Sequence, residues 1–442
     1  MKKLISLSFC LILSSILIAQ DSKFNIFDIF STNKKTEKDW TFMVYITSNN
    51  DLYEFSELNL KQMATVGSND NLNIIAQQDS YGKQEIKRLF IKKNNTQVIE
   101  TITNKPECIS GTPNNLFNFA QWAIKNYPAK QYALILWDHG SGIIDPNIWK
   151  YNPANLYILN PETGLYELNR AEITKRGICF NEVFEVYLKN QDLKLALSRI
   201  SKELLNNNKL DILGMDACNM AMLEVGCQIK DSVKIMVGSE ETEPGTGWNY
   251  QTVLTPLLTK KLNPQEFATQ IVNAYQASYE KNYSDFTQSA VNLEKINFIE
   301  ISLNKISEEL INLLSTPNRP DILRTIKRIR SNKKYTTSFA NADYIDLGHF
   351  LTSLKDQMNK KLILESYKEE YDILKNLLKN IEESQIILDS LIINKTICKS
   401  ILNTTGLSFY FPTRKIHESY FLTDFAKTNK WLNFLKVYLI QK

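Results

Sequence analysis

Short, almost entirely apolar stretches alternate with amphipathic helical patterns over the first half of this 442-residue chain. A strand that is apolar on both faces belongs in a parallel sheet whose two sides are covered by helices. The predicted helices include 53–66 and 114–127, where apolar residues recur at three- and four-residue spacing. The predicted strands span 40–46, 72–78, 86–91, 96–102, 132–137 and 210–215. We therefore predict an α/β fold with a mainly parallel central sheet between two helical layers.

The rest of the chain is helix-rich, and we divide the molecule into a sheet-forming core at 40–262 and a helical part at 263–442. The stretch "LSFYF", stopped by Pro412, predicts a last strand that returns to the core. Residues 143–176 carry Asn and Pro without a stable period, so this segment is either an inserted loop or a cleavable linker. The helical patterns of the second part cover 265–283, 301–315, 320–332 and 361–392.

The N-terminus has the layout of a secretory signal peptide. Two lysines precede a short apolar run that ends near Ala19, and polar residues follow. We assign 1–20 to this signal and 21–39 to a flexible lead. An uncleaved membrane anchor is the alternative, but the apolar core is short for one, and no later run approaches the ~20 apolar residues that span a bilayer. We expect an exported protein, either secreted or held in the periplasm or at the cell surface of a bacterium.

Charge and cysteine content exclude several classes of protein. The chain has 52 basic and 48 acidic residues, and no Lys/Arg cluster is interleaved with aromatic residues, which argues against nucleic-acid binding. Six cysteines include Cys10 of the signal, so five remain, too few for a disulfide framework. An odd number leaves at least one thiol unpaired. Neither a CxxC nor an HxxxH pattern occurs, and we predict no metal site from such motifs.

His139 is the first residue that suggests chemistry. It is one of only three histidines, and it follows the predicted strand 132–137 at a Gly-Ser-Gly turn. In open α/β sheets the ligand crevice lies outside the carboxyl ends of the strands. A histidine that merely packs in the core would be expected within the apolar run. The other two, His349 and His417, lack such a turn, and we interpret them as structural.

Cys218 repeats this arrangement. It follows the strand "LDILGM", and helical periodicity resumes at Met220, so the pattern predicts a thiol at a strand end and near a helix N-terminus. A helix N-terminus favours the thiolate, which is the nucleophilic form. With His139 as its base, Cys218 could carry acyl transfer, and the backbone amides of Gly140 and Cys218 would be the oxyanion donors. The alternative is a small buried hydrophobe, the role we assign to Cys227.

Five blocks of sequence carry a family resemblance. They are "WTFMVYITSNNDL", "FNFAQWAIKNYPAKQYALILWDHGSG", "LDILGMDACNMAMLEVGCQIKD", "VGSEETEPGTGWNY" and "GLSFYFP". In this order they resemble the clostripain-like cysteine peptidases, relatives of the caspases and gingipains. The resemblance implies a caspase-like α/β/α sandwich and a Cys–His dyad, with His139 as base and Cys218 as nucleophile. It implies an endopeptidase acting on protein or peptide substrates, and we expect a monomer.

The sequence departs from that family pattern at two places that bear on function. Thr246 stands where members that cleave after arginine or lysine resemble "PGDGW", while Asp216 matches the other acidic residue near the pocket. We therefore predict a preference for Arg or Lys before the scissile bond, weaker than with two acids. The stretch between the dyad residues is also longer, and Lys175 and Arg176 near its end offer a site for self-cleavage.

The chemistry of such a dyad requires no cofactor. Some family members depend on calcium, and the run Glu240-Glu241-Thr242-Glu243 could supply oxygen ligands, although a solvated acidic turn is the interpretation we favour. Two other functions compete with peptide hydrolysis. A caspase-like fold could serve as a catalytically silent surface-binding module, but that role requires neither His139 nor Cys218. A thiol oxidoreductase would need a second, suitably spaced cysteine.

Overall fold

The computed structural model describes residues 36–145, 157–159, 166–168, 178–283, 285–396 and 398–440. The expected signal peptide, most of the flexible lead, and Lys175 and Arg176 lie outside the described residues. From Lys38 onward the chain forms one compact unit. In the part that the structure describes, no helix combines the length and the apolar character needed to cross a membrane.

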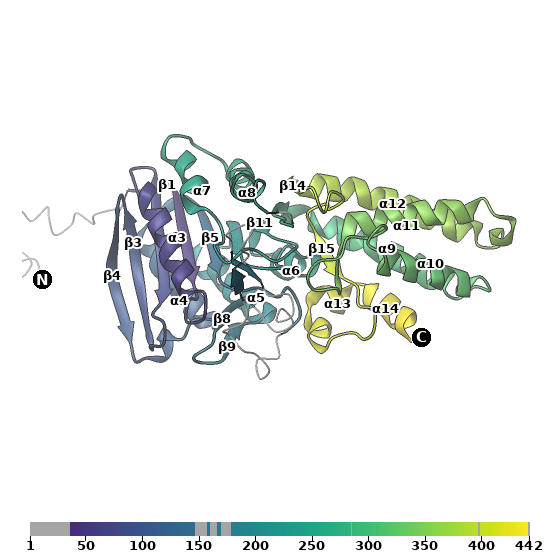
Figure 1. The fold of residues 1–442 in the computed structure, drawn as a ribbon, viewed down its shortest axis with the longest axis horizontal. Coiled ribbons are helices and arrows are strands. Elements are labelled where there is room, and N and C mark those ends of the chain that lie inside the picture. Colours follow the sequence, from purple (N-terminus) through teal and green to yellow (C-terminus); the bar gives the residue numbers. More distant parts are fainter. Residues whose placement is uncertain are drawn as a thin grey trace, which may run out of the picture. The chain divides into compact units, whose positions relative to one another are not determined.

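A nine-stranded sheet runs through the described part of the chain (Figure 1). Its five central strands are parallel, and each end is extended by two antiparallel strands. From one edge to the other the order is β14 (Ile392–Lys395), β12 (Ser289–Asn292), β11 (Val233–Gly238), β10 (Leu210–Asp216), β5 (Ala129–Trp137), β1 (Lys38–Ile46), β2 (Leu72–Asp79), β3 (Glu85–Lys92) and β4 (Asn95–Thr103). The predicted parallel sheet is confirmed.

Both faces of the sheet are covered by helices. Alternate side chains of each central strand point to opposite faces of the sheet. In β1, for example, Met43 and Phe42 belong to different buried clusters. The layer on the Met43 side contains α4 (Pro113–Asn126), α5 (Asn190–Arg199) and α6 (Leu223–Ile229). The layer on the Phe42 side contains α3 (Tyr53–Val66), α7 (Tyr250–Leu254) and α8 (Pro264–Tyr279). The α/β/α sandwich that the sequence predicts is therefore confirmed.

The parallel strands follow the order β2, β1, β5, β10, β11. Successive strands are therefore added on one side of β1 up to β2 and on its other side from β5 onward, which makes the boundary between β1 and β5 a topological switch point. Loops that leave the carboxyl ends of strands at such a switch point diverge and create a crevice. The loops after β1, β5 and β10 therefore border the same crevice. Ile46, Trp137 and Asp216, near the ends of these strands, lie opposite one another in register.

The C-terminal part is built from helices that pack side by side (Figure 1). The single helix that the pattern predicts over 361–392 is wrong: the chain turns at 363–370 around buried Tyr367 before a new helix begins. The hydroxyl of Tyr367 accepts a hydrogen bond from Lys361 (3.2 Å), which anchors this turn. The helices are α9 (Ile296–Leu313), α10 (Arg319–Ser331), α11 (Leu347–Leu362), α12 (Tyr371–Leu391), α13 (Asp424–Thr428) and α14 (Trp431–Leu439).

The strand expected near the C-terminus is β15 (Ser408–Tyr410), which pairs with β13 (Tyr344–Asp346) in a small antiparallel sheet. It contacts the core through two amides: that of Ser408 donates to the carbonyl of Ala221 at 2.9 Å, and that of Tyr410 donates to the carboxylate of Glu224 at 2.8 Å. The edge of the large sheet is taken by β14 instead. Our division of the chain at 262 stays a prediction. Two further antiparallel pairs are β6 (Tyr157–Leu159) with β7 (Tyr166–Leu168) and β8 (Ile178–Asn181) with β9 (Val186–Leu188).

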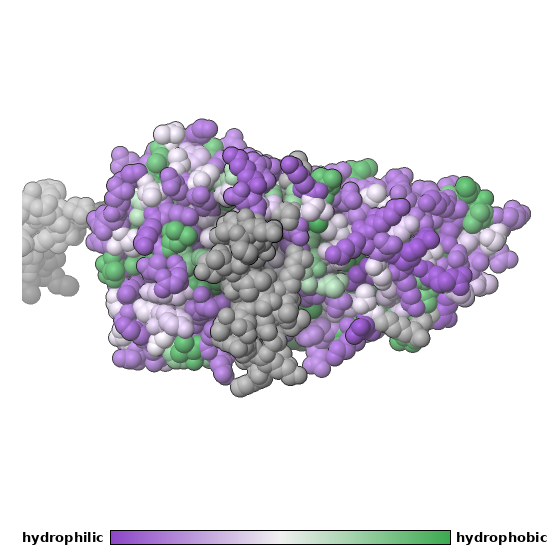
Figure 2. All heavy atoms as spheres, in the orientation of Figure 1, coloured by the Kyte–Doolittle hydropathy of each residue, from purple (hydrophilic) through white to green (hydrophobic). Residues whose placement is uncertain are grey.

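On the face shown in Figure 2, the described surface is largely hydrophilic, with hydrophobic residues scattered among charged ones. Exposed apolar side chains such as Ile363 and Ile386 belong to the C-terminal helical part. Scattered apolar residues of this kind are normal on a protein surface and do not by themselves indicate a binding site.

Candidate active site

The loops that carry His139 and Cys218 leave two adjacent strands, β5 and β10. Trp137 and Asp216 pair in register, and the amide of Asp138 donates to the carbonyl of Asp216 at 3.3 Å. His139 and Cys218 each lie two residues beyond these paired positions, and both are buried. The sheet therefore brings the two loops together at its carboxyl edge.

Gly140 shows how closely the loops approach. A methyl group added to its Cα would lie 2.2 Å from the carbonyl oxygen of Cys218 and 3.0 Å from its amide nitrogen. Such distances are far shorter than van der Waals contact, so only glycine fits here. The backbone of Gly140 is thus packed directly on the backbone of Cys218, and the two amides that we predict as oxyanion donors belong to one small region.

Asp51, which the sequence analysis missed, holds the ring of His139. The imidazole Nε2 lies 2.8 Å from Asp51 Oδ1, and the His139 side chain is almost completely buried. A carboxylate on one ring nitrogen fixes the tautomer and orientation of a histidine and stabilises the imidazolium form. The available signal was the polar sequence "TSNND" after the strand 40–46, because this strand neighbours the one that delivers His139.

A second network supports the loop of His139. The Asn50 side-chain amide donates to Asp138 Oδ1 at 2.7 Å and to the carbonyl of Phe180 at 2.8 Å. The amide of Phe180 in turn donates to the Asp138 carboxylate. Strand β8, which contains Phe180, is thereby tied to Asn50 and Asp138, the residues that immediately precede Asp51 and His139. The network connects the chain just after the 143–176 segment to the candidate base.

The environment of Cys218 differs from the sequence prediction. Helix α6 begins at Leu223, five residues later, so the thiol does not lie in the first turn of a helix. The chain between them pairs with its neighbours instead: the amides of Asn219 and Ala221 donate to the carbonyls of Glu241 and Ser239. The thiol receives a different donor. The backbone N–H of Glu243 points at Cys218 Sγ, with an N to S distance of 3.2 Å.

A small pocket adjoins the thiol, and Asp216 is part of its wall. The Asp216 carboxylate accepts hydrogen bonds from the amide of Trp248 (3.1 Å) and the hydroxyl of Tyr250 (2.8 Å). A methyl group on Gly247 would lie 2.7 Å from Asp216 Oδ1, so a side chain there would collide with the carboxylate. The other residues of the wall are Leu52, Trp137, Asp138, Ala217, Cys218, Glu243, Pro244 and Gly245.

Thr246 and Glu243 do not lie where the sequence suggests. The Thr246 hydroxyl lies 2.9 Å from the hydroxyl of Tyr279, and Thr246 is not in the wall of the pocket. The Glu243 carboxyl instead lies beside that of Asp216. Burial raises the pKa of Asp216 to about 6, and burial together with the Asp216 charge raises the pKa of Glu243 well above its ordinary value. The two groups therefore favour holding a proton between them.

The acidic run 240–243 is not a solvated turn, and that expectation is wrong: Glu240, Glu241 and Glu243 are all buried. Their side chains diverge. Glu240 lies near Asp346, Glu241 accepts from the amide of Ala340 at 3.0 Å, and Glu243 lies near Asp216. Because a calcium site needs converging oxygen ligands, this run does not fit one. Elsewhere in the described residues, no group of three or more His, Cys, Asp or Glu side chains is placed to hold a metal ion.

Of the remaining cysteines and histidines, Cys179 lies near Asp138, beside the network that supports the His139 loop. Cys227 is buried on α6, and burial raises the pKa of its thiol well above the ordinary value. His349 and His417 are in the C-terminal part, where their ring nitrogens contact Thr337 and Ser419. Cys108, Cys179 and Cys398 are likewise buried and form no disulfide.

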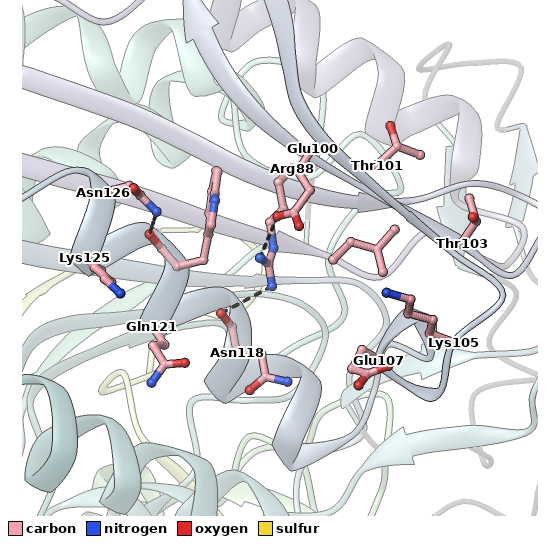
Figure 3. A pocket seen from close by; sticks show the side chains of 12 residues that line it. Arg88, Glu100, Thr101, Thr103, Lys105, Glu107, Asn118, Gln121, Lys125 and Asn126 are labelled. Carbon is pink, nitrogen blue, oxygen red and sulfur yellow. Dashed lines mark hydrogen bonds and ion pairs between the residues drawn. The ribbon is translucent and has the colours of Figure 1, made fainter.

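A larger groove of about 740 Å³ lies between α4 and strands β3 and β4 (Figure 3). Arg88 crosses it, with an ion pair to Glu100 at 2.8 Å, a hydrogen bond to the carbonyl of Asn118 at 3.4 Å and its guanidinium over the ring of Trp122. None of its wall residues belongs to the loops of His139 or Cys218. Its size therefore does not make it the candidate active site.

A histidine and a cysteine delivered by adjacent strands of an α/β/α sandwich, with an acidic pocket beside the thiol, define the class of caspase-like cysteine peptidase folds. Within that class the chain belongs to the clostripain family, whose model matches residues 44–157 and 161–438. The resemblance found in the sequence is confirmed. The chain is 28% identical over 250 residues to clostripain of Hathewaya histolytica, a match that covers 50% of this chain and 43% of clostripain.

Solved structures share the fold. A secreted C11 cysteine protease from Bacteroides thetaiotaomicron, in complex with an irreversible peptide inhibitor, superposes with a TM-score of 0.59 at 18% identity, covering 89% of this chain and 99% of that one. An inactive zymogen C11 protease from Parabacteroides distasonis gives a TM-score of 0.57 at 16% identity, covering 89% and 98%. At these identities the comparison supports the common architecture.

Proposed function

We propose that the protein is an exported cysteine endopeptidase that hydrolyses peptide bonds through Cys218 and His139. The observation that carries the proposal is the junction of the two loops, where Gly140 packs on Cys218 and Asp51 holds the His139 ring. Family membership supports the same reaction. The chain matches less than half the length of clostripain, so the activity rests on this site.

The reaction proceeds in two halves. His139 accepts the thiol proton of Cys218, and the thiolate attacks the carbonyl carbon of the scissile bond. The amides of Gly140 and Cys218 stabilise the oxyanion, and the C–N bond breaks as His139 returns the proton to the leaving amine. Water then attacks the thioester, giving a proton to His139, and the C–S bond breaks to release the acid. His139 returns that proton to the departing Cys218 thiolate, which restores the free enzyme. With Nε2 held by Asp51, we assign the proton transfers to Nδ1 of His139.

Specificity and maturation form the finer part of the proposal. Asp216, beside the thiol, supports a preference for Arg or Lys before the scissile bond, because a carboxylate and a guanidinium form charge-assisted hydrogen bonds. The same preference would allow the enzyme to cut itself after Lys175 or Arg176. The N-terminal sequence supports export, and we expect a monomer that acts on proteins or peptides without a required cofactor.

Labelling with a peptidyl acyloxymethylketone, followed by mass spectrometry, tests the activity directly. We expect the adduct on Cys218, and we expect Cys218→Ala to abolish both labelling and cleavage of a fluorogenic peptide panel. The matched control is Cys227→Ala, which removes a buried thiol from the core and should retain activity. A Cys218→Ala protein with wild-type turnover would contradict the proposal. A folded wild type that is neither labelled nor active would favour the silent binding module.

A further inference from the structure

Glu243 occupies a place that neither the peptide-hydrolysis mechanism nor the sequence pattern accounts for. It lies on the loop after β11, and its backbone N–H donates to Cys218 Sγ at 3.2 Å. Its side chain forms part of the wall of the pocket that contains Asp216. One residue therefore contacts the nucleophile through its backbone and reaches the pocket beside it with a carboxyl group.

The Glu243 side chain is only 3% exposed and is poorly satisfied. Oε1 accepts a long hydrogen bond of 3.5 Å from Gln288, and Oε2 has no hydrogen-bond partner. The indole of Trp248 lies beside the Glu243 carboxyl, and a further neighbour, the hydroxyl of Tyr275, has no hydrogen-bond partner. A buried polar group without a partner costs free energy, so the unpartnered Glu243 oxygen in the wall of this pocket indicates a place prepared for a polar occupant.

The charge of the cluster indicates what that occupant is. Asp216 and Glu243 lie side by side, and among the described residues no Lys or Arg forms an ion pair with either of them. Two buried carboxyls without a cation favour holding a proton between them. A guanidinium offers five N–H donors in a planar fork and is always charged, so it can satisfy both carboxyls at once.

The loop geometry explains why Thr246, the position expected from the family pattern, does not contribute to guanidinium binding. Thr246 directs its hydroxyl to Tyr279, while Tyr279 donates a second contact to the carbonyl of Gly247 at 2.5 Å. The bare Cα of Gly247 lies against Asp216. Residues 244–247 thus pass over Asp216 without supplying a side-chain carboxyl. Glu243, three positions before Thr246, supplies the second carboxyl instead.

We propose that Glu243 is the second acidic determinant of the specificity pocket, and that Glu243 and Asp216 together bind the cationic side chain of the residue before the scissile bond. The inference rests on the proposed peptidase function and deepens it. It predicts strong selection of arginine, with both carboxyls engaged, although Thr246 contributes no charge.

The test compares Glu243→Gln with the wild type on peptides that differ only before the scissile bond, where arginine, lysine, citrulline or norleucine is placed. We expect the ratio of kcat/KM for arginine to that for norleucine to fall by about tenfold or more, mainly through KM. The norleucine peptide and the rate of Cys218 alkylation by iodoacetamide should change little, because the backbone N–H is retained. Glu243→Asp, which keeps the charge, should restore part of the arginine preference and serves if Glu243→Gln does not fold.

Glu241→Gln is the matched control, since Glu241 is a buried acid of the same loop that faces Ala340 instead of the pocket. Its arginine-to-norleucine ratio should equal that of the wild type. Equal losses on all peptides in Glu243→Gln, or a wild type that cleaves norleucine as well as arginine, would overturn the inference and leave the peptidase function standing. A wild type that cleaves no peptide and is not labelled at Cys218 would remove both.

Discussion

His139 Nε2 lies 2.8 Å from Asp51 Oδ1, although 88 positions separate the two residues in the chain. The pair forms because β1 and β5 are adjacent parallel strands, so the loops that follow them begin at the same edge of the sheet. In the proposed mechanism Asp51 is a positioning residue, because it would act on the reaction through the imidazole of His139. Asp51 therefore adds a third group to the dyad that the sequence predicts.

Asp51→Asn should lower kcat/KM by about 100-fold or more, because the carboxylate that stabilises the imidazolium and selects its tautomer is lost. The rate of Cys218 alkylation near neutral pH should fall as well, since less thiolate is present. If Asp51 only stabilised the fold, the rate of Cys218 alkylation would not change. Glu54→Gln, an exposed change in the first turn of α3, is the control and should be silent. Wild-type alkylation and turnover in Asp51→Asn would disprove the assignment.

Gly140→Ala should inactivate the enzyme and destabilise the fold by about 1–3 kcal/mol, because the methyl group overlaps the Cys218 backbone and no side-chain rotation can relieve it. Separating the loops misplaces the base from the nucleophile, which can cost about 100-fold in rate. Thermal unfolding and kcat/KM measure the two effects. In Gly238→Ala the new methyl group meets its nearest atom at 3.4 Å, an ordinary contact, so this variant should be mild. Full activity in Gly140→Ala would show that the loops are not packed as described.

The selectivity for arginine over norleucine should depend on pH. The pKa of Asp216 is raised from its ordinary value of 3.8 to about 6, so below pH 6 this carboxyl is protonated and cannot attract a guanidinium. The ratio of the two kcat/KM values should therefore rise with pH through about 6 and level off above it, while Glu243 and Tyr250, which also face Asp216, keep their protons longer. Taking a ratio cancels the titration of the catalytic pair. Asp216→Asn should give a lower ratio that lacks the rise belonging to Asp216, and any pH dependence that remains in this variant belongs to the Glu243 carboxyl.

Maturation should separate the chain near the end of the 143–176 segment. Purified wild type should accumulate two chains, the second beginning at or near Gly177, and Cys218→Ala should remain a single chain if the cut is made by the enzyme itself. N-terminal sequencing gives the position. Strand β8 begins at Ile178 and is held by Asp138 through Phe180, so the new terminus would adjoin the network behind His139. An intact chain with full activity would rule out processing as a requirement.

The sequence by itself determined the architecture and pointed to the two residues that we propose as base and nucleophile. Apolar runs, their length and the residue that follows each one are local properties, and a parallel sheet places every strand end of one direction at one edge. His139 and Cys218 could therefore be proposed as neighbours before any contact was known. The same locality explains one error. Helical spacing resumes after Met220, but the chain turns at 217–219, with Asn219 at a positive φ, and the amides of Asn219 and Ala221 bond to the neighbouring loop, so the helix begins only at Leu223.

Only the tertiary structure decided which distant groups meet. Asp51 reaches His139 because of the strand order, and the buried Glu243 reaches Asp216 because the loop after β11 folds back over β10. An acidic run looks solvated in sequence, since burial of a carboxyl depends on partners that lie far away in the chain. Sequence spacing fixes what each strand presents at its end, whereas the order of strands and the path of loops fix which of those groups share a site.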